Sequence, residues 1–204
     1  MKKGKFLTLE GVDGAGKSTH MQFIADAVAA ACGTHAIVTR EPGGTDLAER
    51  LRQAILGHAM TPTVETLLLY AARADHVARV IVPALEAGSW VVCDRFSDAT
   101  MAYQGAGKGV PSALIQTLSE AAHPGLVPDR TLVFDCSYTV ARARLSGSGK
   151  TLDRFEREDQ AFFERVRAAY LERARAEPAR LRVIDAAAAL ADIRKALERN
   201  LSDL

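Results

Sequence analysis

The segment Gly11-Val-Asp-Gly-Ala-Gly-Lys-Ser18 fits the pattern G-x-x-x-x-G-K-[ST] of a phosphate-binding loop. The apolar run from Phe6 to Leu9 precedes it and predicts a buried strand, and apolar residues at helical spacing predict a helix from Lys17 to about Ala31. A glycine-rich loop at this place can turn its backbone N–H groups toward a phosphate, and the helix N-terminus adds positive partial charge. The motif and its position therefore predict a nucleoside triphosphate site.

Strands and helices alternate along the rest of the chain. Four more short apolar runs predict strands at residues 36–38, 90–93, 131–134 and 182–184. Helices are expected at residues 46–56, 111–122, 138–145, 156–177 and 188–201, and one long helix or two at 63–87. Short unbroken apolar strands between helices are typical of a parallel sheet covered on both faces. The sequence thus predicts a doubly wound, three-layer α/β fold with a five-stranded parallel sheet flanked by helices.

Composition and charge limit the class of protein. The 204 residues, 48% of them hydrophobic, are expected to form one domain with its own core over residues 1–204. With 26 basic and 25 acidic side chains the net charge is +1, which argues against a broad surface for nucleic acid or an anionic membrane. Cys32, Cys93 and Cys136 suggest neither a disulfide framework nor a zinc site, and no apolar run approaches membrane-spanning length. We expect a cytoplasmic protein.

GTPases, motor-like ATPases and small-molecule kinases share the phosphate-binding loop, so the other motifs in the sequence decide the class. The only asparagine is Asn200, near the C-terminus, so the N-K-x-D guanine-binding motif of regulatory GTPases is absent. Asp94 and Arg95 follow the strand expected at 90–93, at the sheet edge where α/β sites form. Asp94 can hold a magnesium-bound water, and Arg95 can bridge two phosphates. The alternative is a surface ion pair between the two.

Four ordered segments resemble the thymidylate kinase family of nucleoside monophosphate kinases, over nearly the whole chain. They are Glu10–Thr19, Thr39–Thr45, Asp94–Gly105 and Leu152–Glu156. The resemblance implies a P-loop NTPase fold, ATP with Mg²⁺ as the phosphoryl donor, dTMP as the acceptor, dTDP as the product and a homodimer. The nucleotide-binding residues expected in the loop are Gly11, Val12, Asp13, Gly14, Ala15, Gly16, Lys17, Ser18 and Thr19, with Ser18 and Asp94 at the metal.

The resemblance also implies an acceptor site. Asp13 and Arg95 are expected beside the reacting phosphates. The transition state of phosphoryl transfer spreads its negative charge over several oxygens, so it needs cations more than a base. Tyr70 is expected to stack on the base and Arg73 to hydrogen-bond its edge, although the two stand three residues apart where the family commonly has four. The alternative is a core Tyr70 and a solvated Arg73. The remaining contacts are expected from Glu41 and Pro42, in a cis-proline turn, and from Thr100, Tyr103 and Gln104.

A serine- and glycine-rich stretch, Leu145–Thr151, predicts a flexible basic lid over about residues 142–155. Gly14 stands where one branch of the family carries a basic residue in the loop, and the resemblance implies that the lid supplies this cation instead. The candidates are Arg142, Arg144, Lys150 and Arg154, and we expect Lys150 and Arg154 to be catalytic.

Two alternatives to a dTMP kinase stay open at this point. One is a kinase of the same fold that phosphorylates another monophosphate or a deoxynucleoside, because acceptor choice depends on few residues. The other is a nucleotide-dependent switch that holds ATP without transferring its phosphate. A second, aromatic-lined site beside Arg95 favours the enzyme.

Overall fold

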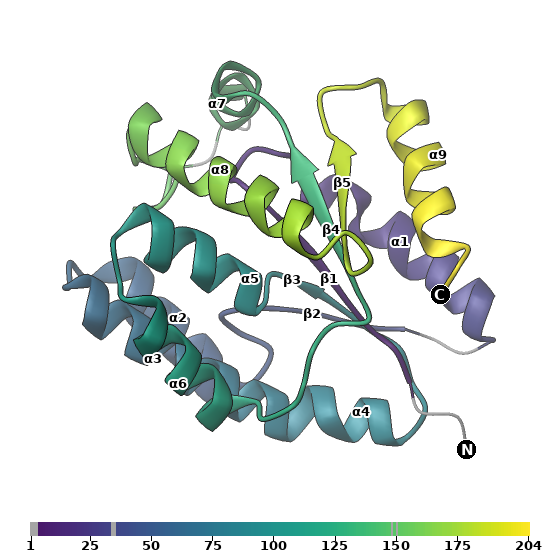
Figure 1. The fold of residues 1–204 in the computed structure, drawn as a ribbon, viewed down its shortest axis with the longest axis horizontal. Coiled ribbons are helices and arrows are strands. Elements are labelled where there is room, and N and C mark those ends of the chain that lie inside the picture. Colours follow the sequence, from purple (N-terminus) through teal and green to yellow (C-terminus); the bar gives the residue numbers. More distant parts are fainter. Residues whose placement is uncertain (1–3, 34–35, 148, 150) are drawn as a thin grey trace.

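The chain is built around a parallel β-sheet. A computed structural model of the protein describes residues 4–33, 36–147, 149 and 151–204. The sheet has five strands in the order β2-β3-β1-β4-β5, and every pairing between them is parallel (Figure 1). The strands are β1 (Phe6–Gly11), β2 (Ile37–Arg40), β3 (Val91–Asp94), β4 (Arg130–Asp135) and β5 (Leu181–Asp185). The predicted five-stranded parallel sheet is confirmed.

Helices cover both faces of the sheet. On one face α1 (Lys17–Cys32) packs against α9 (Leu190–Leu201), and α8 (Gln160–Ala176) crosses the opposite face (Figure 1). The other helices are α2 (Asp46–Gly57), α3 (Pro62–His76), α4 (Val82–Glu86), α5 (Ser97–Thr100), α6 (Ser112–Ala122) and α7 (Tyr138–Gly147). Within the described residues, none of these helices combines the length and the apolarity needed to cross a bilayer.

The central strand β1 is buried along its whole length, which explains the unbroken apolar run at its start. In the register of the sheet, Leu9 of β1 lies beside Asp94 of β3, and Asp94 lies beside Arg40 of β2. Parallel strands end at the same edge. The segments that follow β1, β2 and β3 therefore meet there, which brings together three of the four sequence motifs.

Two helical regions differ from the expectation. Residues 97–107 form α5 and a π-helical segment η2 (Met101–Gly107), although no helix was predicted there. At Gly107 an added Cβ would lie 2.6 Å from the ring of Phe162, so η2 approaches α8 too closely for a side chain at that position. The region expected as one helix or two is a continuous helical run in which the π-helical segment η1 (Val77–Ile81) joins α3 to α4.

The helix α8 confirms its predicted core stripe and shifts its predicted start. Phe162, Val166 and Tyr170 are buried, as the helical spacing indicated. The helix begins at Gln160 rather than near residue 156, because the side chain of Asp159 accepts a hydrogen bond from the N–H of Phe162 at 2.7 Å and caps it.

Candidate active site

The loop between β1 and α1 is arranged to hold an anion. Gly16 precedes α1 in a left-handed conformation, with φ of 93°, and no side chain caps the helix. The ammonium of Lys17 curls back over the loop, 3.1 Å from the carbonyl oxygen of Gly11 and 3.2 Å from that of Val12. At Gly14 an added Cβ would lie 2.5 Å from the carbonyl oxygen of Ala141. The contact with α7 therefore excludes a basic side chain at residue 14.

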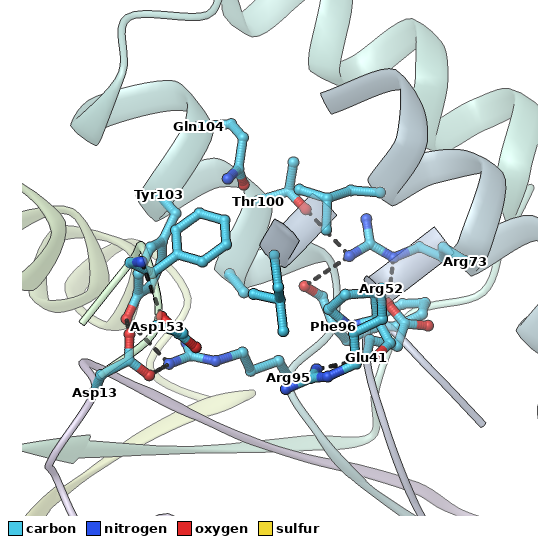
Figure 2. A pocket seen from close by; sticks show the side chains of 15 residues that line it. Asp13, Glu41, Arg52, Arg73, Arg95, Phe96, Thr100, Tyr103, Gln104 and Asp153 are labelled. Carbon is cyan, nitrogen blue, oxygen red and sulfur yellow. Dashed lines mark hydrogen bonds and ion pairs between the residues drawn. The ribbon is translucent and has the colours of Figure 1, made fainter. Parts of the chain in front are cut away.

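Arg95 lies at the centre of the site, at the end of β3. Its Nη2 donates to Asp13 Oδ1 at 2.6 Å and to the hydroxyl of Tyr103 at 3.0 Å (Figure 2). The Tyr103 hydroxyl in turn donates to Asp13 Oδ2 at 2.8 Å. Burial alone would raise the pKa of Asp13, but Arg95 and Lys17 outweigh burial and hold this pKa below its usual value. Asp13 is therefore ionised at neutral pH and fixes the guanidinium.

Asp94 and Ser18 offer oxygen atoms for a magnesium ion. Asp94 Oδ1 is buried and has no hydrogen-bond partner within the described residues. Asp94 and Ser18 both line the same cavity as Lys17. The described part of the chain has no cluster of three or more His, Cys, Asp or Glu side chains suited to a metal. Such a sparse oxygen set fits Mg²⁺, which takes one or two protein ligands and fills its shell with phosphate oxygens and water.

Among the cavities that the described residues line, two contain Arg95. We call the first the inner cavity; the space inside it, counted together with solvent open to its mouth, is about 660 Å³. Its lining is Asp13, Glu41, Pro42, Arg52, Leu56, Leu69, Arg73, Arg95, Phe96, Ala99, Thr100, Tyr103, Gln104, Asp153 and Phe155. Almost all of the expected acceptor-site residues, from Glu41 to Gln104, belong to this set.

The second cavity, the outer groove, runs along the phosphate-binding loop. It is lined by residues 13–20 together with Arg40, Glu41, Arg52, Asp94, Arg95, Arg144, Leu145, Asp153, Glu156, Ala186, Ala188, Leu190 and Ile193. Five side chains line both cavities: Asp13, Glu41, Arg52, Arg95 and Asp153. The two cavities therefore meet at the pair formed by Asp13 and Arg95.

Arg73 is buried at the base of the inner cavity. Its Nε donates to Glu41 Oε2 at 2.6 Å, and its Nη2 donates to the Phe96 carbonyl oxygen at 3.0 Å and to Thr100 Oγ1 at 3.1 Å (Figure 2). Its Nη1 is buried without a hydrogen-bond partner in the described structure. A buried donor of this kind is costly unless a ligand satisfies it. The alternative of a solvated Arg73 is thus wrong.

The acidic partner of Arg73 lies in the predicted turn. The peptide bond between Glu41 and Pro42 is cis, as the resemblance implied. Besides Arg73, Glu41 contacts His76 Nδ1, at 3.0 Å from Oε1. Burial alone would raise the pKa of Glu41, but Arg73 and His76 together lower it. The turn therefore carries a buried, ionised carboxylate that orients Arg73.

The structure does not bring Tyr70 to the inner cavity, which corrects its expected role. Its hydroxyl hydrogen-bonds Ser119 Oγ at 2.6 Å, and its ring stacks near His123 with centroids 6.4 Å apart. On α3 this side chain faces α6, so the alternative of a core tyrosine holds. Leu69, the preceding residue, lines the cavity instead, four residues before Arg73.

The described lid candidates are held by protein partners. Arg142 donates to the Glu156 carbonyl oxygen at 2.8 Å. Arg144 donates to the carbonyl oxygens of Ala15 at 3.2 Å and Ala186 at 2.7 Å, and it lines the outer groove. Both lie on α7 rather than in a loop.

Arg154 lies apart from the loop. It forms an ion pair with Glu65 of α3 and donates to the His58 carbonyl oxygen at 3.2 Å. It lines neither the inner cavity nor the outer groove. Lys150, the other lid residue expected to be catalytic, lies outside the described residues.

Sequence reasoning missed three residues around the site. Arg52 of α2 lines both cavities and donates to the Pro42 carbonyl oxygen at 3.0 Å; in the sequence it looks like any charged residue on a solvated helix face. Cys93 donates from Sγ to the Arg95 carbonyl oxygen at 3.1 Å, and burial raises the pKa of its thiol. Glu10 is fully buried, and in the sequence it looks only like the end of a strand.

Comparisons with known proteins agree on one family. The family described as Thymidylate kinase matches residues 9–197. A thymidylate kinase of Bordetella pertussis is 52% identical over 202 residues, covering 99% of this chain and 96% of that protein. One of Ralstonia nicotianae is 52% identical over 204 residues, covering 98% and 99%. Among solved structures, thymidylate kinase from Ehrlichia chaffeensis superposes with a TM-score of 0.81 at 30% identity, covering 98% of this chain and 99% of that one.

Proposed function

Because this chain belongs to the thymidylate kinase family and phosphorylates dTMP to dTDP with Mg-ATP, we propose that the inner cavity binds dTMP and the outer groove binds ATP. The meeting of the two cavities at Asp13 and Arg95 carries this assignment. A direct transfer between two nucleotides needs both phosphates at one point, with a cation between them. The product serves as a precursor for DNA synthesis.

In this proposal the base of dTMP lies at the closed end of the inner cavity. The free Nη1 of Arg73 donates to an oxygen on the base edge, while Leu69 and Phe96 contact its faces. Gln104, which also lines the cavity, is held by Glu65 at 2.7 Å. Tyr103 lies beside the sugar, where its ring disfavours a 2′-hydroxyl by steric contact. Glu41 and Thr100 shape the site by fixing Arg73, and Pro42 lines the cavity beside Glu41.

The donor phosphates lie along the loop. The backbone of residues 11–19 surrounds them, and the Lys17 ammonium moves from its carbonyl partners to their oxygens. Ser18 and Asp94 hold Mg²⁺, which when bound neutralises charge on the phosphate oxygens. The purine and ribose follow the outer groove toward Ala186, Ala188 and Leu190.

The transfer itself is a direct displacement. A phosphate oxygen of dTMP attacks the γ-phosphorus in line, the bond from that phosphorus to the β–γ bridging oxygen breaks, and ADP leaves with the electron pair. Arg95 bridges the acceptor phosphate and the moving phosphoryl group. Asp13 orients the guanidinium of Arg95 through the 2.6 Å hydrogen bond, and no protein group forms a covalent intermediate.

A lid over residues 142–155 completes the donor side in this proposal. Arg144 already lies in the outer groove and needs only to exchange its carbonyl partners for phosphate oxygens. Lys150 and Arg154 are proposed as further lid cations, and Arg154 must leave Glu65 to act. Closing the lid excludes water and so limits hydrolysis of ATP.

We further propose a single kinase domain over residues 1–204, a cytoplasmic location, no nucleic-acid or membrane partner, and a homodimer. The near-zero net charge supports the absence of a nucleic-acid or membrane partner. Exposed apolar side chains on α3, at Val64 and Leu67, support an interface between two copies. Molar mass by light scattering tests the dimer: a mass of one chain at micromolar concentration contradicts it.

The first experiment is a coupled assay of ADP release with Mg-ATP against dTMP, dUMP, AMP, CMP, GMP and thymidine. We expect the highest kcat/KM with dTMP. Preference for another monophosphate would refute the proposed contacts of Arg73 and Leu69 while leaving the transfer site intact. ADP release that is independent of any acceptor would refute the proposed use of the inner cavity.

A further inference from the structure

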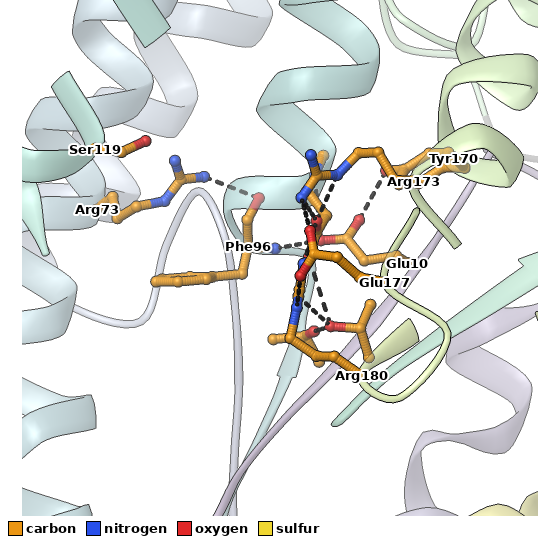
Figure 3. A network of polar contacts seen from close by, with 12 residues as sticks. Glu10, Arg73, Phe96, Ser119, Tyr170, Arg173, Glu177 and Arg180 are labelled. Carbon is orange, nitrogen blue, oxygen red and sulfur yellow. Dashed lines mark hydrogen bonds and ion pairs between the residues drawn. The ribbon is translucent and has the colours of Figure 1, made fainter. Parts of the chain in front are cut away.

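Glu10 is a fully buried carboxylate at the end of β1 that the proposed transfer does not use. Its Oε1 accepts a hydrogen bond from the backbone N–H of Phe96 at 2.7 Å (Figure 3). It also accepts one from the backbone N–H of Ala99 at 3.2 Å. Phe96 stands at the start of α5 and offers no side-chain cap of its own. Glu10 therefore supplies, from a neighbouring strand, the acceptor that the start of this helix needs.

The backbone that Glu10 holds is strained at Arg95. The φ angle of Arg95 is 72°, and Arg95 is the one non-glycine residue with positive φ in the described part of the chain. A residue with a side chain keeps this conformation only where its surroundings impose it. The N–H of Arg95 donates to the Leu9 carbonyl oxygen at 2.9 Å, and the next N–H, of Phe96, donates to Glu10. Strand β1 thus holds the strained residue by two successive N–H groups.

The second oxygen of Glu10 reaches the side chain of the same arginine through Tyr170. The Tyr170 hydroxyl donates to Glu10 Oε2 at 2.7 Å and accepts from Arg95 Nη1 at 3.2 Å. Because its hydrogen points to Glu10, the hydroxyl oxygen faces the guanidinium. One carboxylate therefore fixes both the backbone and the side chain of Arg95.

The ionised form of Glu10 is the form that can accept all three hydrogen bonds, since a protonated carboxyl carries a hydrogen on one oxygen. Burial, followed by the charge of Asp98, raises the pKa of Glu10 to about 7, and Arg95 opposes them. Asp98 is itself bound by Arg173 and Arg180, each at 2.7 Å. The charged or titratable groups around Glu10 are Asp98 of α5, Arg95 after β3, Tyr170 of α8, Lys17 of α1, Cys93 of β3 and Arg73 of α3.

We propose that Glu10 is a positioning residue for phosphoryl transfer, which holds Arg95 at the junction of the inner cavity and the outer groove. The inference rests on the role proposed above for Arg95. Glu10 lines neither cavity. Its effect on the reaction therefore passes through Arg95 and not through contact with a nucleotide.

The test is Glu10→Gln, which keeps the shape but replaces one accepting oxygen by an amide donor. We expect kcat to fall about tenfold, because displacing a catalytic charge by a fraction of an ångström lowers the rate by a factor of this order. The KM values for ATP and dTMP should stay within about twofold, since ground-state contacts remain. In the wild type, kcat should fall as the pH drops through about 7, the pKa of Glu10. This limb should be absent from the variant.

Thr8→Val is the matched control. It removes another buried side-chain hydrogen bond of β1, the 2.7 Å contact between Thr8 and Thr131, without touching Arg95. We expect a lower melting temperature and unchanged kcat. If Glu10→Gln behaves like this control, with wild-type kcat and an unaltered pH profile, Glu10 is only structural and the proposal is wrong.

A second variant keeps the proposal testable if Glu10→Gln does not fold. Tyr170→Phe leaves the cap on α5 intact and removes the link to the guanidinium, and we expect kcat to fall about threefold, the effect of one lost hydrogen bond. Unchanged kcat overturns the proposal. Arg95→Ala, measured in parallel, distinguishes the role proposed for Arg95 from the role proposed for Glu10. Full activity of Arg95→Ala refutes the role of Arg95 itself. Low activity of Arg95→Ala together with normal activity of the Glu10 and Tyr170 variants refutes only the role of Glu10.

Discussion

The arginines of the inner cavity and those of α7 are held in different ways. Arg73 donates to the Glu41 carboxylate and Arg95 to the Asp13 carboxylate, each at 2.6 Å. The four side chains of these two ion pairs are largely shielded from solvent. Arg144 on α7 instead donates to backbone carbonyl oxygens. A carbonyl oxygen is a weaker partner for a guanidinium than an ionised carboxylate. The acceptor side is therefore arranged by folding, whereas the donor side can rearrange when phosphates arrive.

This difference suits the order of demands on a phosphotransferase. The acceptor must be placed within a fraction of an ångström of the donor, which needs rigid groups. The donor side must open for ATP and ADP to exchange, which needs contacts that break at low cost. Arg154 departs from the pattern, since it is a lid candidate that is bound to the carboxylate of Glu65.

The largest expected effect is on the acceptor side, whose arginines are held rigidly by carboxylates. Arg95→Ala should lower kcat by about 10³-fold, or about 4 kcal/mol in the barrier, because the transition-state charge loses its bridging cation. The KM for ATP should change little, since Lys17 and the loop remain. Steady-state kinetics with saturating dTMP measure this effect. A kcat within a factor of a few of the wild type would contradict a rigid catalytic arginine.

Stability is the second measure of the rigid side. Arg73→Met should lower the free energy of unfolding by about 3 kcal/mol, because it leaves Glu41 buried without its main partner. Urea denaturation checks the size. The double variant with Glu41→Gln should recover part of the loss, whereas additive losses would show that the two side chains are not coupled.

The same pair predicts a pH dependence with a definite sign. The pKa of Glu41 is lower in the folded chain than its ordinary value of 4.5, so the ionised carboxylate stabilises the fold above that value. This stabilisation is lost as the pH falls below 4.5 toward the folded pKa. Denaturation midpoints between pH 6 and pH 3 should therefore fall more steeply in the wild type than in Arg73→Met. Parallel curves would contradict the assignment.

Variants on the donor side, where the arginine partners can exchange, should show a smaller effect, and this effect should be on the binding of ATP. Arg144→Ala should raise the KM for ATP about tenfold, about 1.4 kcal/mol, because one charge-assisted contact to phosphate is lost. The KM for dTMP should not change. Arg142→Ala is the matched control on the same helix, since Arg142 does not line the outer groove. An equal effect of both variants would point to the stability of α7 rather than to a phosphate contact.

The smallest expected effect separates two neighbours on α3. Tyr70→Phe should leave the KM for dTMP within about twofold and lower the free energy of unfolding by about 1 kcal/mol, since it loses the bond to Ser119. Leu69→Ala should raise the KM for dTMP more, because Leu69 lines the inner cavity. The reverse order would restore Tyr70 to the base.

The parts of this structure that the sequence predicted depend on local patterns. The loop at Gly11–Ser18, the apolar strands and the stripe of Phe162, Val166 and Tyr170 each follow from spacing along the chain. Asp94 and Arg95 could be placed at the sheet edge because strands end there. These features need no knowledge of what lies across the fold.

What the sequence missed depends on contacts between distant segments. The choice between Leu69 and Tyr70 turns on which side of α3 meets α6, and the ion pair of Arg154 with Glu65 joins residues far apart in the chain. Arg52 is one of several charged residues on α2, and its place at both cavities follows from the turn before that helix. The helical segment at residues 97–107 includes η2, whose Gly107 approaches the ring of Phe162 on α8, a residue far away in the sequence.

The thiol of Cys93 allows the local opening of the end of β3 to be measured by chemical labelling. Its Sγ is buried and bonded to the carbonyl oxygen of Arg95, and burial holds its pKa high, so the folded chain presents a protonated, inaccessible thiol. An alkylating reagent can modify it only in molecules in which this strand end has transiently opened. The labelling rate of Cys93 therefore reads out the local opening free energy at the catalytic centre, and bound nucleotides should slow it in proportion to how firmly they close the site.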